Sequence, residues 1–305
     1  MTNKPRLVSE ELKILRSLND RMILSEKEAN HLWYLEKGYA GEQMFDEWSE
    51  KLSNNCLILN DLLLEFSTNT FQIDSLLISE GTIYLFEVKN YEGDYIVEKE
   101  RWYSTSNNEI KNPLPQLERS EALLRRYLHG LGYTFTIEPY LIFINPNFTL
   151  YQAPFNKSII FPTQLNSFLT KINAKISSAK PNGRHAKIAQ LLIDAHQTKS
   201  RYTHIPDYSY EELKKGITCA RCHKFIANFK GKGLFLVCIC GSIENTQSAI
   251  LRSVAEFNLL FPDRKITTKV IMEWCGIFKC PKTIQKILSK NFKRVDHGKS
   301  SYYVK

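Results

Sequence analysis

Two apolar segments that flank Gly81 are the feature of this 305-residue chain that most constrains its fold. In the segment 82–88, TIYLFEV, both alternating sets of residues are mainly apolar. Because successive side chains of a strand point to opposite faces, this pattern predicts a strand that is covered on both faces. The segment 71–78, FQIDSLLI, is similarly apolar, and a two-residue loop at Glu80 and Gly81 would join the two strands as a hairpin. We therefore expect a sheet that is flanked by helices.

The register of this hairpin brings two acidic residues together. If Ser79 pairs with Thr82, then Asp74 lies directly opposite Glu87. Their Cβ atoms would be about 5 Å apart, where like charges destabilise a sheet unless a cation or a proton intervenes. Carboxylate oxygens and water are the ligands that Mg²⁺ prefers, so this pair is a candidate site for Mg²⁺ or Mn²⁺. Lys89, about 7 Å along the strand from Glu87, could steady the charge that develops on a phosphate.

The alternative is that Glu87 and Lys89 form an ordinary solvated ion pair with no catalytic role. Two observations weigh against it: Asp74 falls in register with Glu87, and the flanking residues of both strands are apolar. A carboxylate pair at the end of such a hairpin is therefore a candidate for metal-assisted chemistry on a phosphate, and the solvated ion pair stays open as the alternative.

The remaining segments complete the predicted organisation. A helical period runs through residues 26–52, and an amphipathic helix is expected at 117–131. Strands are expected at 57–66, 71–78, 82–88 and 95–103. The expected parts are an α/β domain at 1–197, a linker at 198–215, a cysteine-bearing module at 216–243 and a helical domain at 244–305.

Glycine, acidic and amide residues recur in a characteristic order around the hairpin, over about residues 35 to 126. They are Gly38, Gly41, Glu42, Gln72, Ile73, Asp74, Gly81, Glu87, Val88, Lys89, Asn90, Gly93, Trp102, Asn112, Pro113, Leu114 and Gln116. This ordered set resembles the NERD (nuclease-related) domain, a family that resembles the PD-(D/E)XK nuclease superfamily in its core. The resemblance implies an α/β, restriction-endonuclease-like mixed sheet flanked by helices.

The same resemblance implies roles for five residues. Asp74 and Glu87 would be metal ligands, Lys89 the catalytic lysine, Glu42 a further acidic contributor from the first helix, and Gln116 a polar residue that faces the site from the following helix. As alternatives, Glu42 is a solvated helix residue and Gln116 only serves the start of its helix.

Four of the seven cysteines fall between residues 219 and 240. Cys219 and Cys222, fifteen intervening residues, then Cys238 and Cys240 have the two-pair arrangement of a zinc ribbon. A module of about 25 residues cannot bury enough apolar area alone, so four thiolates on a structural Zn²⁺ would hold it together. His223 completes a Cys-x-x-Cys-His haem-attachment motif, which the second cysteine pair disfavours; four free cysteines are the other alternative.

The C-terminal 44 residues carry 11 Lys and Arg against 3 Asp and Glu, which is +8 of the total charge of +9. Two short helical patterns separated by a turn at Gly276, followed by a possible hairpin, resemble a winged helix. The candidate phosphate contacts are Lys282, Thr283, Lys286 and Lys290 on the last helix and Lys293, Arg294 and Lys299 on the wing. A winged-helix protein-interaction module with a solvated basic face is the alternative.

Charge and composition limit the class of protein. Apolar residues make up 43% and charged residues 24%, as in soluble globular proteins. No segment approaches the roughly 20 apolar residues of a spanning helix, and the first residues lack the apolar region of a signal peptide. We therefore expect a cytoplasmic protein without a membrane partner.

A nearly neutral body with a basic tail suits a polyanionic partner, which favours nucleic acid and, given the nuclease resemblance, DNA. We expect a Mg²⁺- or Mn²⁺-dependent phosphodiesterase that hydrolyses DNA while its C-terminal modules hold the nucleic acid. The alternatives are a non-catalytic DNA-binding or regulatory protein with a vestigial nuclease fold, and a protein-interaction adaptor.

Overall fold

The structure is a computed structural model that describes residues 2–52, 55–176, 181–198, 203–230, 233–278, 280–296 and 301–304. The chain divides into two compact units. The N-terminal unit comprises Met1–Val8 and Trp33–Thr203, and the C-terminal unit comprises Ser9–Leu32 and His204–Lys305. The segment Ser9–Leu32 therefore clusters with the C-terminal residues, whereas the linear division expected from the sequence places it in a domain at 1–197.

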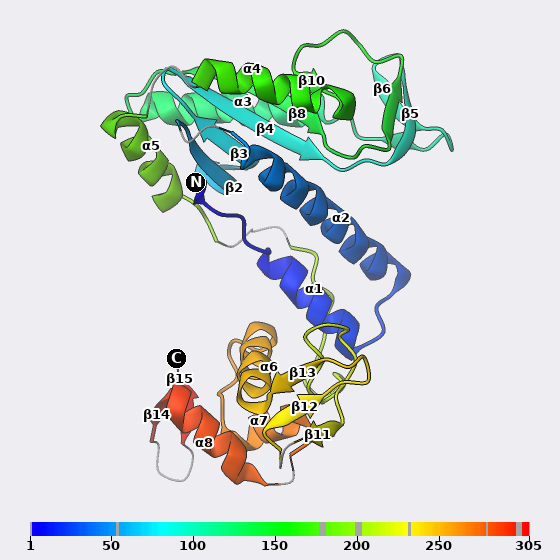
Figure 1. Ribbon diagram of the computed structural model, residues 1–305, viewed down its shortest axis with the longest axis vertical. Coiled ribbons are helices and arrows are strands. Elements are labelled where there is room, and N and C mark those ends of the chain that lie inside the picture. Colours follow the sequence, from blue (N-terminus) through cyan, green and yellow to red (C-terminus); the bar gives the residue numbers. More distant parts are fainter. Residues whose placement is uncertain are drawn as a thin grey trace. The chain divides into compact units, whose positions relative to one another are not determined.

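The N-terminal unit is built on a mixed sheet with the strand order β1-β2-β3-β4-β8-β10 (Figure 1). Strands β2, β3 and β4 form an antiparallel meander, and β8 then lies parallel to β4. This is the α/β class with a mixed sheet that the sequence predicts. The strands are β1 (Thr2–Lys4), β2 (Leu57–Phe66), β3 (Asn69–Ile78), β4 (Thr82–Lys89), β8 (Thr136–Phe143) and β10 (Ile159–Ile160).

Helices cover both faces of this sheet, as the alternation in residues 82–88 predicts. On one face Leu85 joins a buried cluster with Leu124 of α3. On the other face the ring of Phe86 lies 5.0 Å from that of Phe45 in α2 and 6.4 Å from that of Phe168 in α4. The helices of this unit are most of α2 (Glu26–Ser49), α3 (Leu114–Gly130), α4 (Leu165–Ile176) and α5 (Gly183–Asp194), with a 3-10 turn, η1, at Pro162–Gln164.

A second, smaller sheet has the order β7-β6-β5-β9. The sequence predicts one strand at 95–103, which is wrong: the segment is a hairpin that turns at Lys99 and Glu100, whose φ angles are +47° and +70°. Neither residue is a glycine, so the local sequence carries no turn signal. The strands are β5 (Gly93–Glu98), β6 (Arg101–Ser104), β7 (Glu109–Ile110) and β9 (Phe148–Tyr151).

The C-terminal unit packs its helices around Trp274, Phe257 and Leu288, all fully buried. Residues from the expected linker contribute to this core, because Tyr210 and Leu213 are also buried there. The elements are α1 (Glu10–Arg21), an antiparallel sheet of β11 (Asn228–Lys230), β12 (Phe235–Val237) and β13 (Ile243–Asn245), then α6 (Thr246–Leu260), α7 (Thr268–Cys275), α8 (Pro281–Asn291) and the paired strands β14 (Lys293–Val295) and β15 (Tyr302–Val304).

Arg21 fastens α1 into this unit. Its guanidinium donates to both carboxylate oxygens of Glu256 at 2.9 and 2.7 Å and to the Lys214 carbonyl oxygen at 2.7 Å. It also lies 3.9 Å from the centroid of the Trp274 ring. These partners all belong to the C-terminal unit, which explains why the segment Ser9–Leu32 clusters with it.

Within the described ranges, each helix is too short or too polar to span a lipid bilayer.

The two glycines of α2 offer a matched test of packing. A Cβ added at Gly41 would lie 2.4 Å from Asn90 Cβ, whereas one added at Gly38 would meet no atom within 4 Å. We expect Gly41→Ala to lower the free energy of unfolding by about 1–3 kcal/mol through overpacking. Gly38→Ala should raise it by up to about 1 kcal/mol, because alanine is the better helix former. Urea unfolding of both variants checks this; equal stabilities would contradict the close packing at Asn90.

Candidate active site

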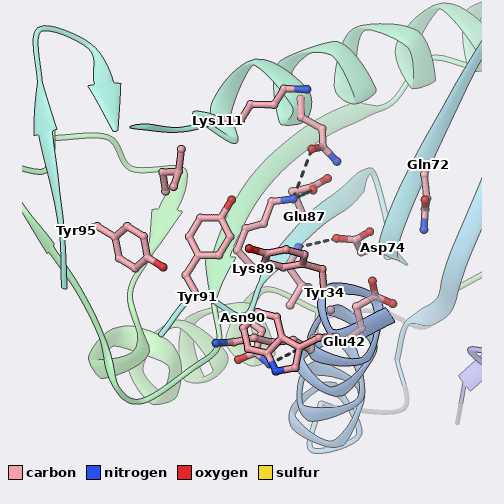
Figure 2. A pocket seen from close by; sticks show the side chains of 16 residues that line it. Tyr34, Glu42, Gln72, Asp74, Glu87, Lys89, Asn90, Tyr91, Tyr95 and Lys111 are labelled. Carbon is pink, nitrogen blue, oxygen red and sulfur yellow. Dashed lines mark hydrogen bonds and ion pairs between the residues drawn. The ribbon is translucent and has the colours of Figure 1, made fainter. Parts of the chain in front are cut away.

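A pocket of about 600 Å³ opens beside α2, where β3 and β4 carry their polar residues (Figure 2). It brings together all five residues that the sequence predicts for the site: Glu42, Asp74, Glu87, Lys89 and Gln116. The other lining residues are Trp33, Tyr34, Lys37, Gly38, Gln72, Val88, Asn90, Tyr91, Tyr95, Ile110 and Lys111.

The hairpin of β3 and β4 places the two central carboxylates. Ile78 pairs with Ile83, which is the register that the two-residue loop predicts, and the ladder continues to Ser75 and Phe86. Beyond that point the Val88 N–H donates to Asp74 Oδ2 at 2.8 Å, so a carboxylate takes the place of the next backbone acceptor.

Asp74 and Glu87 consequently lie on the same side of the sheet, in one pocket. They are only 7% and 1% exposed.

Lys89 lies over this carboxylate pair. Its Nζ donates to Glu87 Oε1 at 2.7 Å and, at the longer distance of 3.5 Å, to Gln116 Oε1 from α3. Burial disfavours the ammonium, but the charges of Glu87 and Asp74 outweigh it and raise the pKa of Lys89. Lys89 is therefore a fixed positive charge inside the pocket, with Gln116 helping to orient it.

Arg6 contacts the acidic residues of this site, and the sequence does not predict that contact. Its guanidinium donates to Glu42 Oε2 at 2.5 Å, to both oxygens of Asp46 at 3.0 Å and to the backbone oxygen of Asp74 at 2.8 Å. The Arg6 side chain is only 3% exposed. It reaches the site because β1 pairs in parallel with β2. No motif or spacing links Arg6 to the hairpin.

The carboxyl groups of the pocket are electrostatically coupled. Burial, followed by the nearby Asp74 charge, raises the pKa of Glu42 to about 8, although Arg6 opposes the rise. The same two causes raise the pKa of Glu87 to about 8, with Lys89 opposing. Burial also raises the pKa of Asp74. The three groups resist simultaneous ionisation, and a bound dication is one way to relieve that conflict.

The carboxylates of the pocket are not arranged as a closed metal cage. Within the described residues, three or more His, Cys, Asp or Glu ligand atoms lie within 4.8 Å of one another only at the cysteines of the C-terminal unit. The carboxylates of Glu42, Asp74 and Glu87 are therefore more widely spaced than a closed cage. Mg²⁺ and Mn²⁺ suit such a site, since they bind carboxylate oxygens, and Mg²⁺ in particular keeps several waters.

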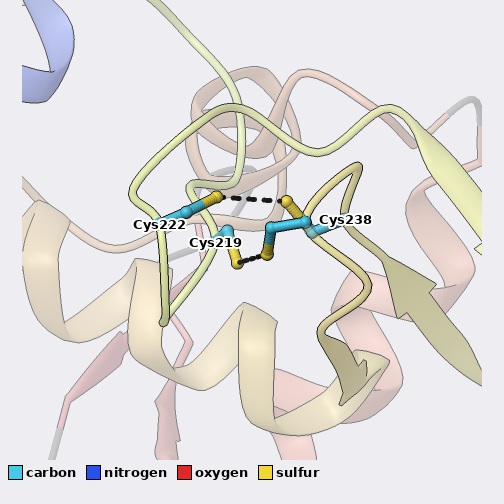
Figure 3. Close-up of side chains that lie close together, drawn as sticks. Cys219, Cys222 and Cys238 are labelled. Carbon is cyan, nitrogen blue, oxygen red and sulfur yellow. Dashed lines mark hydrogen bonds between the residues drawn. The ribbon is translucent and has the colours of Figure 1, made fainter.

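Cys219, Cys222, Cys238 and Cys240 form the cysteine cluster, in which all four Sγ atoms lie within 4.8 Å of one another. The Sγ atoms of Cys222 and Cys238 are 3.4 Å apart, and those of Cys219 and Cys240 are 3.7 Å apart (Figure 3). Four thiolates at about 2.3 Å from a tetrahedral Zn²⁺ would be about 3.8 Å apart. The cluster could therefore hold a metal ion such as structural zinc, as the cysteine spacing predicts.

Zinc content tests this cluster, with Cys280 as the control because it is exposed and outside the cluster. We expect the purified protein to carry about one equivalent of zinc and Cys219→Ser to lose it, together with a drop in the Tm of the C-terminal unit. Cys280→Ser should keep both the zinc and the Tm. Metal analysis and thermal unfolding measure the two outcomes; a metal-free wild type that folds normally would contradict the assignment.

The basic residues predicted to contact nucleic acid lie in the C-terminal unit. Those within the described ranges are all exposed: Lys282, Thr283, Lys286 and Lys290 on α8, and Lys293 and Arg294 on β14. Lys299 lies outside the described residues. Arg294 Nε donates to Asp296 Oδ1 at 2.8 Å, so its charge is partly compensated. The lysines of α8 form the main exposed basic surface of these elements.

Comparison with protein families identifies one matching segment. Residues 37–144 match the family model of NERD, the nuclease-related domain. The matched range contains Glu42, Asp74, Glu87, Lys89 and Gln116, and it supports the NERD resemblance expected from the sequence. No curated protein and no solved structure gives a significant match to the chain.

Proposed function

We propose that this protein is a metal-dependent nuclease that hydrolyses phosphodiester bonds in DNA. The observation that carries the proposal is the convergence of Asp74, Glu87 and Lys89 in one pocket at the end of a buried hairpin. The match of the surrounding residues to the nuclease-related domain supports it independently.

Five polar residues of the pocket have roles in this proposal. Mg²⁺ or Mn²⁺ bound by Asp74 and Glu87 would polarise a phosphate oxygen and lower the pKa of a water. Lys89 donates to a phosphate oxygen and stabilises the negative charge that develops during attack. Gln116 keeps the Lys89 ammonium in place, and Glu42 adds a third carboxylate whose position is set by Arg6.

The C-terminal unit would hold the substrate in this scheme. Exposed lysines attract a polyanion and release its counterions, which the carboxyl groups of the pocket do not. We propose that α7, α8 and the strands β14 and β15 act as a winged-helix-like module. The cysteine cluster and the β11-β12-β13 sheet would act beside it as a zinc-ribbon-like module.

A cleavage assay tests the catalytic part of the proposal. We expect the wild type to degrade DNA with Mg²⁺ or Mn²⁺, and Asp74→Asn, Glu87→Gln and Lys89→Met each to lose roughly 100-fold or more in rate. Glu98→Gln is the control, because Glu98 is an exposed carboxylate outside the pocket. Thermal unfolding confirms that the variants are folded. Absence of cutting with any divalent metal on double- or single-stranded substrates would refute hydrolysis.

Salt titration tests the binding part. Replacing Lys282 and Lys286 with alanine should weaken DNA binding and reduce the slope of log K against log salt by roughly 2, because each phosphate contact contributes about 0.9. The matched control replaces Lys157 and Lys187, which are exposed on the N-terminal unit. If both pairs change the slope equally, α8 is not the binding surface.

A further inference from the structure

Aromatic side chains line the pocket beside its carboxylates. Trp33 and Tyr34 come from α2, Tyr91 follows β4, and Tyr95 lies on β5. Figure 2 shows Tyr34, Tyr91 and Tyr95 around the space that holds Lys89. Aromatic rings are not needed for phosphate chemistry, so they point to another part of the substrate.

Two of the aromatic residues of α2, Trp33 and Tyr34, are largely exposed. Trp33 is 53% exposed and Tyr34 is 67% exposed, whereas Trp48, Trp102 and Trp274 are 6%, 1% and 0% exposed. Trp33 and Tyr34 contact each other edge to face at 5.0 Å. Large rings that the core does not bury are available to a ligand, and exposed aromatic groups beside a pocket mark binding surfaces.

Tyr91 and Tyr95 are held more firmly. The Tyr91 ring lies 6.0 Å from that of Phe143 and 5.6 Å from that of Tyr95, while Tyr95 lies 5.5 Å from Phe148. These contacts fix the two tyrosines on the core of the unit while both still line the pocket. They supply a rigid aromatic wall that loses little entropy when a flat ligand packs on it.

Two lysine side chains besides Lys89 line the pocket together with these aromatic rings. Lys37 Nζ lies 4.9 Å from the Trp33 ring centroid and 3.1 Å from Glu92. That ion pair is partly exposed and so contributes little, which leaves the ammonium able to exchange its partner for a phosphate. Lys111 is exposed and lines the same pocket. Flat rings with interleaved cations form the surface that binds unpaired bases and their phosphates.

We propose that the pocket binds single-stranded nucleic acid, with unpaired bases stacked on Trp33 and Tyr34 and the backbone directed toward Asp74, Glu87 and Lys89. This inference rests on the proposed function and names its substrate class. Bases inside a duplex are stacked on one another, so their faces cannot meet these rings. A duplex would have to open before it entered the pocket.

The intrinsic fluorescence of Trp33 can report base stacking in this test. Trp33 is the exposed member of its four tryptophans, so stacking of a base on it should quench the intrinsic fluorescence of the full-length protein. The titrant is oligothymidylate of about eight nucleotides at about 0.3 M salt, which weakens phosphate contacts more than stacking. Ca²⁺ fills the carboxylate site, and a gel verifies that the oligonucleotide stays intact.

Four variants define the expected result. Tyr34→Ala should raise the Kd from quenching by roughly tenfold, since one stacked base accounts for that much affinity. Trp33→Ala should raise the Kd similarly when a labelled oligonucleotide reports binding, and Trp33→Phe should abolish quenching but largely keep affinity. Tyr151→Ala is the control, because Tyr151 is 52% exposed and outside the pocket, and it should change nothing.

The arms of the experiment separate the possible results. A duplex of the same sequence should quench at least about tenfold less well than the single strand. An oligouridylate arm decides whether the single strand is DNA, RNA or either. Equal quenching by duplex and single strand, or no change of Kd in Tyr34→Ala, would overturn the inference.

Failure of this inference differs visibly from failure of the proposed function. Quenching that depends on Tyr34, without cleavage under any metal, keeps the single-strand site and removes the hydrolytic role. Metal-dependent cleavage without quenching keeps hydrolysis and removes the single-strand site. Absence of both refutes both.

Discussion

The carboxylates of Asp74 and Glu87 lie at the end of a hairpin whose other side chains are mainly apolar and buried. Burying an ionised carboxylate costs several kcal/mol, so the surrounding structure must offset that desolvation. The Val88 N–H and the Lys89 ammonium donate to these carboxylates, and the nearby charge of Arg6 favours the ionised form of Asp74. Residues from the N-terminal segment, the β2-β3-β4 meander and α2 therefore surround the same buried carboxyl groups, and the repulsion among these groups is only partly offset.

Close packing of α2 is part of the same arrangement. Gly41 faces Asn90, whose Nδ2 donates to the Lys37 backbone oxygen at 2.8 Å, while Asn145 Nδ2 donates to Asn90 Oδ1 at 2.9 Å. A single amide thus ties α2 to the residues that follow β4 and β8. This contact brings Glu42 to the carboxylate pair and also brings Trp33 and Tyr34 to the rim of the pocket.

The sequence predicts those parts of the structure that are determined by residues close together in the chain. The alternation in residues 82–88 reports burial on both faces, and a two-residue loop fixes the register that aligns Asp74 with Glu87. The spacing of four cysteines likewise predicts their cluster. Arg6 could not be predicted, because its place depends on a short parallel strand and on contacts more than thirty residues away in sequence. The turn at Lys99 and Glu100 could not be predicted either, because two non-glycine residues adopt positive φ angles there.

The placement of α1 affects how the chain can acquire its structure. Arg21 is synthesised before Glu256 and Trp274, its partners in the C-terminal unit, which come more than two hundred residues later. The two units are therefore interleaved along the chain: Met1–Val8 and Trp33–Thr203 belong to one, and Ser9–Leu32 and His204–Lys305 belong to the other. During translation the segment Trp33–Thr203 can fold before the C-terminal partners of α1 are made, and the apolar face of α1 stays uncovered until then. The entropic cost of bringing α1 to its distant partners grows only slowly with the number of residues between them. Aggregation through the exposed apolar face of α1 is therefore the larger risk for the nascent chain.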